Sequence, residues 1–189
     1  MKRKIIEMKK NLIVFASNTG NTEKVAIEIA KNFEKYGWSN NLKKLPNDYD
    51  TKNPDFDFND YDFACVGSPV NSELPLLQIR TVTYGKPELR KITPGPKCGL
   101  VFCTYAGVHL GPPEAEPALK LLELELMHQE FQVIGSLAIP GNLRGRDTSE
   151  TYFGDLRNRP NENDLKNVAL FVDDIINKLN DFPYYQSNN

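Results

Sequence analysis

The chain has few residues able to form a metal centre or a disulfide framework. Its 189 residues include only three cysteines and two histidines. Cys65, Cys98 and Cys103 form no C-x-x-C pair and fall within apolar runs, a pattern typical of reduced, buried thiols in a cytoplasmic protein. We therefore expect no metal site, no disulfide and a cytoplasmic location.

The chain also lacks long apolar runs and an excess of charge. No stretch is long and apolar enough to span a bilayer, so we expect no membrane partner. The formal net charge is −2 and the isoelectric point is about 5.8, which gives no support to nucleic-acid binding and predicts weak electrostatic steering. A hydrophobic content of 40% and a charged content of 25% are ordinary for a globular protein.

The length favours one domain, because 189 residues can bury most of the surface of the unfolded chain. The first ten residues are basic, and their apolar insert is too short for a signal-peptide core. We predict a flexible extension over residues 1–10, a single domain over residues 11–182 and a tail over residues 183–189.

Two familiar nucleotide motifs are absent, and a different one stands near the N-terminus. The chain has no G-x-G-x-x-G fingerprint and no P-loop ending in Gly-Lys-Ser/Thr. Instead, the apolar run Leu12-Ile13-Val14-Phe15 leads directly into Ser17-Asn18-Thr19-Gly20-Asn21-Thr22 and then into a helical pattern. A polar turn with open backbone N–H groups at a helix start suits one terminal phosphate. The alternative is a helix N-cap in which Ser17 or Asn21 only satisfies backbone donors.

The rest of the chain repeats this strand-and-turn design. Apolar runs at residues 61–66 and 98–103 end in the polar turns 67–72 and 104–107, and further strands are predicted at residues 38–45 and 131–139. Helical spacing is found at residues 22–36, 74–89, 112–130 and 165–179, with surface loops at 46–59 and 140–163. Alternation of strands and helices predicts an α/β fold whose parallel sheet is covered on both faces. The three turns should then meet at the carboxyl edge of the sheet.

These turns carry a resemblance to a known family. Ser17-x-Thr19-Gly20-x-Thr22 resembles the phosphate loop of flavodoxins and related FMN proteins, Asp62 to Pro69 resembles their second flavin loop, and Thr104 to Gly107 stands in the place of the third. Arg159-Pro160 also resembles the entry to their last helix. The resemblance implies a doubly wound, open five-stranded parallel sheet of order 2-1-3-4-5, with helices on both faces.

The resemblance also implies FMN as the cofactor and assigns residues to it. The first loop would hold the ribityl phosphate, the second and third would line the two sides of the isoalloxazine, and Tyr105 is the best candidate to stack on the ring. No side chain need act as a catalytic acid or base. The implied cofactor-binding residues are Ser17, Asn18, Thr19, Gly20, Asn21, Thr22, Ser68, Pro69, Val70, Asn71, Ser72, Thr104, Tyr105, Ala106 and Gly107.

Two departures from the family pattern keep the role open. The stretch 69–73 has no glycine, although Asn71 could adopt a left-handed conformation, and Gly107-Val108-His109 stands where electron-carrier flavodoxins have an acid. The leading hypothesis is a flavodoxin-like electron-transfer protein with a reductase and an acceptor as redox partners, existing as a monomer or weak dimer. The alternatives are an FMN-dependent NAD(P)H oxidoreductase and a flavin-free interaction module.

Four arginines in the long loop 140–163 bear on the same choice. They could meet the phosphate of a nicotinamide nucleotide or an acidic partner. Alternatively, they belong to a solvated loop with interspersed acidic residues. The four are Arg144, Arg146, Arg157 and Arg159.

Overall fold

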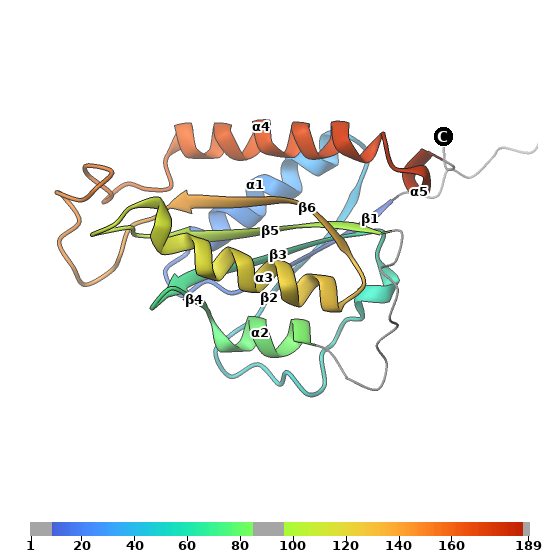
Figure 1. Ribbon diagram of the computed structural model, residues 1–189, viewed down its shortest axis with the longest axis horizontal. Helices are drawn as coiled ribbons and strands as arrows, with labels where there is room; N and C mark the ends of the chain where they lie inside the picture. The colour runs from blue at the N-terminus through green and yellow to red at the C-terminus, as the bar shows by residue number, and fades with distance from the viewer. Residues whose placement is uncertain (1–8, 85–96, 187–189) are drawn as a thin grey trace, which may run out of the picture.

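The computed structural model describes residues 9–84 and 97–186, which form an α/β sandwich around one sheet (Figure 1). The sheet's strands are β1 (Lys10–Phe15), β2 (Ser39–Lys44), β3 (Phe63–Asn71), β4 (Leu74–Pro75), β5 (Cys98–Tyr105) and β6 (Gln132–Pro140). The α-helices are α1 (Asn21–Lys35), α2 (Leu77–Tyr84), α3 (Glu116–His128), α4 (Glu162–Leu179) and α5 (Pro183–Gln186). Two short 3-10 helices are η1 (Phe58–Asp60) and η3 (Pro112–Ala115).

The strand order confirms the predicted topology. The strands run β2-β1-β3-β5-β6, all paired in parallel, which is the predicted order 2-1-3-4-5 with β5 and β6 as its fourth and fifth strands. The short β4 is an addition that pairs antiparallel with the end of β3. Strand order reverses between β1 and β3, so this sheet has its switch point at those two carboxyl ends.

Helices cover both faces of the sheet, as predicted. On one face, α1 and α4 pack on Ile13 and Phe15, and on the other face α2 and α3 pack on Leu12 and Val14. Successive residues of β1 therefore point to opposite cores, which is why the strand reads as a continuous apolar run.

The segment after β3 differs from the prediction. The predicted strand ends at Val66, but β3 continues to Asn71 and turns back into β4 as a hairpin. The left-handed residues are Ser72 (φ 49°) and Glu73 (φ 60°), and not Asn71. Positive φ at both central residues is the type I′ pattern of a two-residue hairpin, so the turn type decides the conformation here and overrides residue preference. Of the predicted helix 74–89, residues 77–84 form α2, whereas Leu74–Pro75 form β4 and residues 85–89 lie outside the described residues.

The two predicted terminal segments are partly integrated into the fold. The Lys9 carbonyl accepts a hydrogen bond from the Ser39 N–H (2.9 Å), and β1 begins at Lys10, so these two residues are not a flexible extension. Within the predicted tail, Tyr185 is 2% exposed, because its ring packs against Trp38 and its hydroxyl is hydrogen-bonded on both sides. The ordered domain therefore extends to α5.

The cysteines agree with the prediction from the sequence. Cys65, Cys98 and Cys103 are buried free thiols, as predicted. Within residues 9–84 and 97–186, no helix combines the length and the apolar character that a membrane crossing needs.

Candidate functional site

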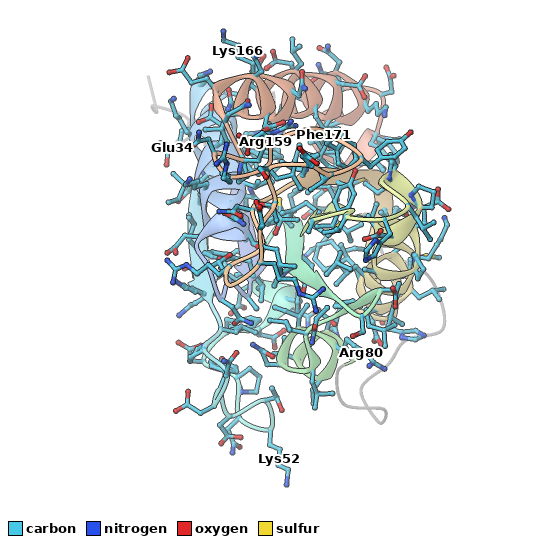
Figure 2. All side chains as sticks on the ribbon, turned by 90° about the vertical axis from the view of Figure 1, so that its left-hand side faces the viewer. Glu34, Lys52, Arg80, Arg159, Lys166 and Phe171 are labelled. Atoms are coloured by element: carbon cyan, nitrogen blue, oxygen red, sulfur yellow. The ribbon has the colours of Figure 1, made fainter. Side chains whose placement is uncertain are left out.

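Four segments meet beyond the carboxyl ends of the central strands. They are the turn after β1, the β3–β4 hairpin, the loop after β5 and the loop 141–161 after β6, and Figure 1 shows the last three projecting from the same end of the sheet. Figure 2 views the molecule from this edge of the sheet. Arg159 lies near the start of α4, and Arg80 belongs to α2 on the other face of the sheet. The sheet topology thus brings together residues that are far apart in the sequence.

These segments enclose a cavity of about 470 Å³, within the range of about 300–1,000 Å³ usual for small-molecule sites. The lining combines polar and charged residues with a few apolar and aromatic ones. Its lining residues are Asn18, Thr19, Asn21, Pro69, Val70, Asn71, Ser72, Glu73, Leu76, Thr104, Tyr105, Ala106, Val108, His109, Glu114, Gly141, Asn142, Leu143, Arg144 and Arg146.

The turn after β1 presents backbone N–H donors at the start of α1. Gly20 is the N-cap of α1 with φ 89°, a left-handed conformation that glycine adopts without a steric cost. The Ser17 hydroxyl accepts from the N–H groups of Gly20 (3.1 Å) and Glu23 (3.3 Å). In the described part of the chain, no acceptor is found for the backbone N–H groups of Asn18, Thr19, Asn21 and Thr22. Because these donors also lie at the positive end of the α1 dipole, the turn is suited to an anion.

Hydrogen bonds tie this turn to the neighbouring segments. The hydroxyls of Thr22 and Thr104 are 2.8 Å apart and buried, which links the first turn to the end of β5. The Asn21 side chain donates to the carbonyl oxygen of Asn142 (2.7 Å), which links the turn to the loop 141–161. The two links hold the donors in place before any ligand arrives.

Tyr105 lines the cavity but is largely covered by protein. Its side chain is 6% exposed, and its ring meets that of Phe153 edge to face at a centroid distance of 5.7 Å. Burial raises the pKa of the Tyr105 hydroxyl to about 12, so the group stays neutral at physiological pH. Tyr105 therefore adds an uncharged side chain to the cavity lining.

The loop after β5 is fixed by a carboxylate. Glu114 Oε1 accepts from the backbone N–H groups of His109 (2.9 Å) and Leu110 (2.7 Å). His109 is exposed at the rim, and its side chain belongs to the cavity lining. Glu114 thus acts as an internal acceptor that ties η3 to the loop after β5.

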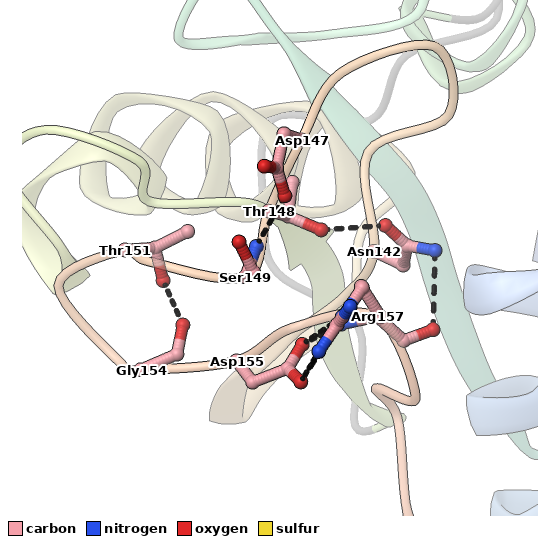
Figure 3. A network of polar contacts seen from close by, with 8 residues as sticks. All are labelled: Asn142, Asp147, Thr148, Ser149, Thr151, Gly154, Asp155 and Arg157. Carbon is pink, nitrogen blue, oxygen red and sulfur yellow. Dashed lines mark hydrogen bonds and ion pairs between the residues drawn. The ribbon is translucent and has the colours of Figure 1, made fainter.

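The loop 141–161 is organised around Asn142 (Figure 3). The Asn142 side chain donates to the carbonyl oxygen of Arg157 (3.1 Å) and accepts from the hydroxyl of Thr148 (2.9 Å). Its backbone N–H donates to the carbonyl oxygen of Arg159 (3.1 Å). Arg157 forms a bidentate pair with Asp155, with Nη2 to Oδ2 at 2.6 Å, and this arginine holds the pKa of the Asp155 carboxyl down at about 2. The loop is therefore an internally bonded unit.

The structure places ten of the fifteen candidate residues in the cavity lining. These are Asn18, Thr19, Asn21, Pro69, Val70, Asn71, Ser72, Thr104, Tyr105 and Ala106. The other five hold the frame behind the lining: Ser17, Gly20, Thr22, Ser68 and Gly107. Ser68, for example, is fully buried, and its hydroxyl accepts from the Leu76 N–H (2.9 Å).

Sequence reasoning missed the contribution of the loop after β6. Asn142 and Leu143 line the cavity, and so do Glu73 and Glu114 from the other loops. The one available signal was the cluster of arginines in this loop, of which Arg144 and Arg146 reach the lining. Asn142 itself has no sequence signature, because its role depends on hydrogen bonds to distant backbone groups.

Solved structures share this fold. Flavodoxin 1 from Bacillus cereus matches with a TM-score of 0.63 at 17% identity, over 89% of this chain and 98% of its own. A flavodoxin, WrbA-like protein from Agrobacterium tumefaciens matches with a TM-score of 0.60 at 15% identity, over 92% and 99%. Rubredoxin oxygen:oxidoreductase from Desulfovibrio gigas matches with a TM-score of 0.60 at 18% identity, over 90% of this chain and 36% of its own. No family model and no curated protein matches the sequence. The chain thus has a flavodoxin-like fold.

Proposed function

We propose that this flavodoxin-like chain binds FMN in the cavity and carries electrons between redox proteins. One observation carries the proposal: backbone donors at the start of α1 that have no acceptor in the described part of the chain open onto a cavity that Val70 and Tyr105 also line. A phosphate dianion fits the donors, and a flat heteroaromatic ring fits the space between the β3–β4 hairpin and residues 104–106. FMN combines these two groups.

The phosphate end is prepared by the chain itself. Backbone N–H groups of Asn18, Thr19, Asn21 and Thr22 are available to donate to phosphate oxygens, and the α1 dipole favours the negative charge. The acidic residue that follows the turn, Glu23, is paired with Lys44 (2.7 Å), which reduces its repulsion of an anion. Charge-assisted hydrogen bonds to backbone donors are among the strong ones, so this end supplies much of the affinity.

The other part of the lining supplies apolar and aromatic surface. Val70 in β3 and Tyr105 at the end of β5 both line the cavity, and both pack into the same apolar cluster. When bound, FMN supplies one- and two-electron transfer, and the residues around the ring set how easily it is reduced. We assign no acid or base role to any side chain, and we propose a reductase and an acceptor as partners of a monomer or weak dimer.

The experiment is a titration of the purified protein with FMN, followed by quenching of flavin fluorescence. We expect a yellow protein that binds FMN at micromolar concentration or below. Thr19→Glu places a carboxylate beside the open donors, so FMN binding should weaken at least about a hundredfold, whereas riboflavin, which has no phosphate, should lose much less. Thr51→Glu, in the loop 46–59 far from the cavity lining, is the matched control and should change neither affinity.

A colourless protein whose melting temperature does not respond to FMN contradicts the proposal and leaves the flavin-free interaction module. Equal loss of FMN and riboflavin affinity in Thr19→Glu would instead place the phosphate elsewhere. Either outcome would change the proposal about the cofactor and would leave the fold as described.

The second candidate is an FMN-dependent NAD(P)H oxidoreductase. The exposed His109 and the arginines Arg144 and Arg146 at the cavity favour it, because they offer polar and cationic groups to a nucleotide at the mouth. Anaerobic mixing of the FMN-loaded protein with NADPH or NADH decides between the two. Rapid bleaching of the flavin supports the oxidoreductase, and no bleaching without a separate reductase supports the carrier.

A further inference from the structure

A second, smaller pocket adjoins the cavity at its phosphate end. It has a volume of about 260 Å³ and shares Thr19, Asn21, Asn142 and Arg144 with the larger cavity. Because the shared residues include the turn with the open backbone donors, the two pockets meet where the flavin phosphate is proposed to bind. The remaining lining residues are Lys24, Arg157, Asn158 and Arg159.

The lining of this pocket is cationic and contains no carboxylate. Arg157 and Arg159 are held by Asp155 and Asp164 respectively, so their guanidinium groups have fixed positions. In the described part of the chain, Lys24 and Arg144 have no acidic partner within salt-bridge distance. Arg157 and Arg159 are thus held in place by carboxylates, while Lys24 and Arg144 are not paired with an acid in the described part of the chain. Four cationic side chains around one polar pocket favour an anion with several oxygens.

One phosphate on the turn after β1 does not account for this charge. That phosphate is already served by backbone donors and the α1 dipole, while Lys24 and Arg157 line only the second pocket. A group joined to the first phosphate, or lying beside it, would enter the cationic pocket directly.

We propose that this pocket is a subsite for a second phosphate group, esterified to a nucleoside, next to the flavin phosphate. The inference rests on the proposed flavin site and deepens it. The second phosphate has two possible sources: the flavin itself, as the pyrophosphate of FAD, or a separate nucleotide bound beside FMN. In both cases Lys24, Arg144, Arg157 and Arg159 offset the added charge.

The experiment compares FMN and FAD affinities, measured by fluorescence titration at low and at moderate salt. If the flavin is the source, FAD binds about tenfold more tightly than FMN at low salt, and the advantage shrinks as salt screens the cations. Lys24→Gln and Arg157→Gln should each reduce the FAD advantage several-fold. Lys52→Gln removes the same charge from a loop outside both pockets and is the matched control, expected to leave the ratio unchanged.

A second arm tests the separate source. ADP is titrated into the FMN-loaded protein by calorimetry, and binding that weakens in Lys24→Gln assigns the pocket to a second nucleotide. The subsite is overturned if FAD has no advantage and ADP does not bind, or if either binds equally well to Lys24→Gln and Arg157→Gln. If neither flavin binds at all, the proposed function fails together with the subsite, whereas FMN binding without either effect overturns the subsite alone.

Discussion

The two ends of the sheet are built for opposite purposes. At the amino end, Tyr185 closes the structure: its hydroxyl donates to the carbonyl oxygen of Asp62 (2.7 Å) and accepts from the Cys98 N–H (2.7 Å). The Asp62 carboxylate is likewise used, since it accepts from the Lys10 N–H (2.8 Å) and from the Tyr184 hydroxyl (2.9 Å). At the carboxyl end, four backbone donors of the turn after β1 remain without an acceptor in the described part of the chain.

Stability and function are separated between the two ends of this sheet. Buried polar groups are normally hydrogen-bonded, because an unpaired one costs about 1–3 kcal/mol. The amino end follows this rule through contacts between distant segments, while the carboxyl end keeps its donors at a cavity where solvent or a ligand can reach them. Changes at the closed end should therefore alter folding, and changes at the open end should mainly alter binding.

The largest expected effect is at the closed end. Tyr185→Ala removes a buried ring that packs on Trp38 and should destabilise the protein by about 3–5 kcal/mol in urea unfolding. Tyr185→Phe keeps the ring but leaves the Cys98 N–H and the Asp62 carbonyl unpaired, so we expect a loss of about 1–3 kcal/mol. Tyr152, 65% exposed near the cavity, is the comparison: Tyr152→Ala should cost about 1 kcal/mol or less.

If Tyr185→Ala and Tyr152→Ala cost the same, the distinction between a closed and an open end is wrong. FMN affinity, in contrast, should not respond to a change at the closed end. Folded Tyr185→Phe protein should bind FMN as tightly as the unchanged protein.

The second prediction concerns the hydroxyl pair that joins two loops at the open end. Thr22→Val or Thr104→Val alone leaves one buried hydroxyl without its partner and should cost about 1–3 kcal/mol. The double variant removes both hydroxyls with little change of shape, so its cost should be clearly smaller than the sum of the two. A double-mutant cycle in urea measures this coupling. Additive losses would mean that the two hydroxyls act independently.

The sheet and the edge that carries the cavity could be predicted from the sequence. The apolar runs of β1, β3 and β5 and the turns that follow them predicted a parallel sheet and the edge at which the loops meet, whereas the strand order was implied by the resemblance to flavodoxins. This works because strand burial and helix spacing are local periodic signals. The ten candidate residues in the cavity lining lie directly after predicted strands, where topology alone places them.

The parts that sequence reasoning missed depend on contacts between distant segments. Tyr185 belongs to a short polar stretch that reads as a tail, and only its fit against Trp38 and Asp62 makes it part of the core. Asn142 is one asparagine in a polar loop, yet it bonds to Asn21, which is 121 residues away. Neither contact has a period or a motif, so neither could be read from the chain.

The third prediction tests strain at the cavity. Ser72 and Glu73 both have positive φ, which costs roughly 1–2 kcal/mol per residue for side chains that bear a Cβ. Asn-Gly is the pair that a two-residue hairpin turn prefers, so the double change Ser72→Asn with Glu73→Gly should stabilise the protein by about 1 kcal/mol. Urea unfolding is again the measurement. A loss of stability would show that the turn holds these side chains through contacts that offset the strain.

The smallest expected effect is a difference in labelling rate between two thiols of the same strand. Cys98 begins β5 at the closed end, whereas Cys103 lies at its other end, two residues before Tyr105. Burial raises the pKa of Cys98 to about 11 and that of Cys103 to about 12, so at pH 8 both are protonated and neither reacts in the folded state. Labelling then requires an opening motion that returns the thiol to water and to its ordinary pKa.

Such openings should be more frequent where the structure is less closed. With a thiol-specific reagent at pH 8 and peptide mass spectrometry, we therefore expect Cys103 to be labelled before Cys98, although both react slowly and only unfolding exposes them fully. Saturation with FMN should slow Cys103 selectively, because a ligand in the cavity stabilises the folded carboxyl end. Equal labelling rates, with or without FMN, would mean that the sheet opens as one unit and that the contrast between its ends does not extend beneath the surface.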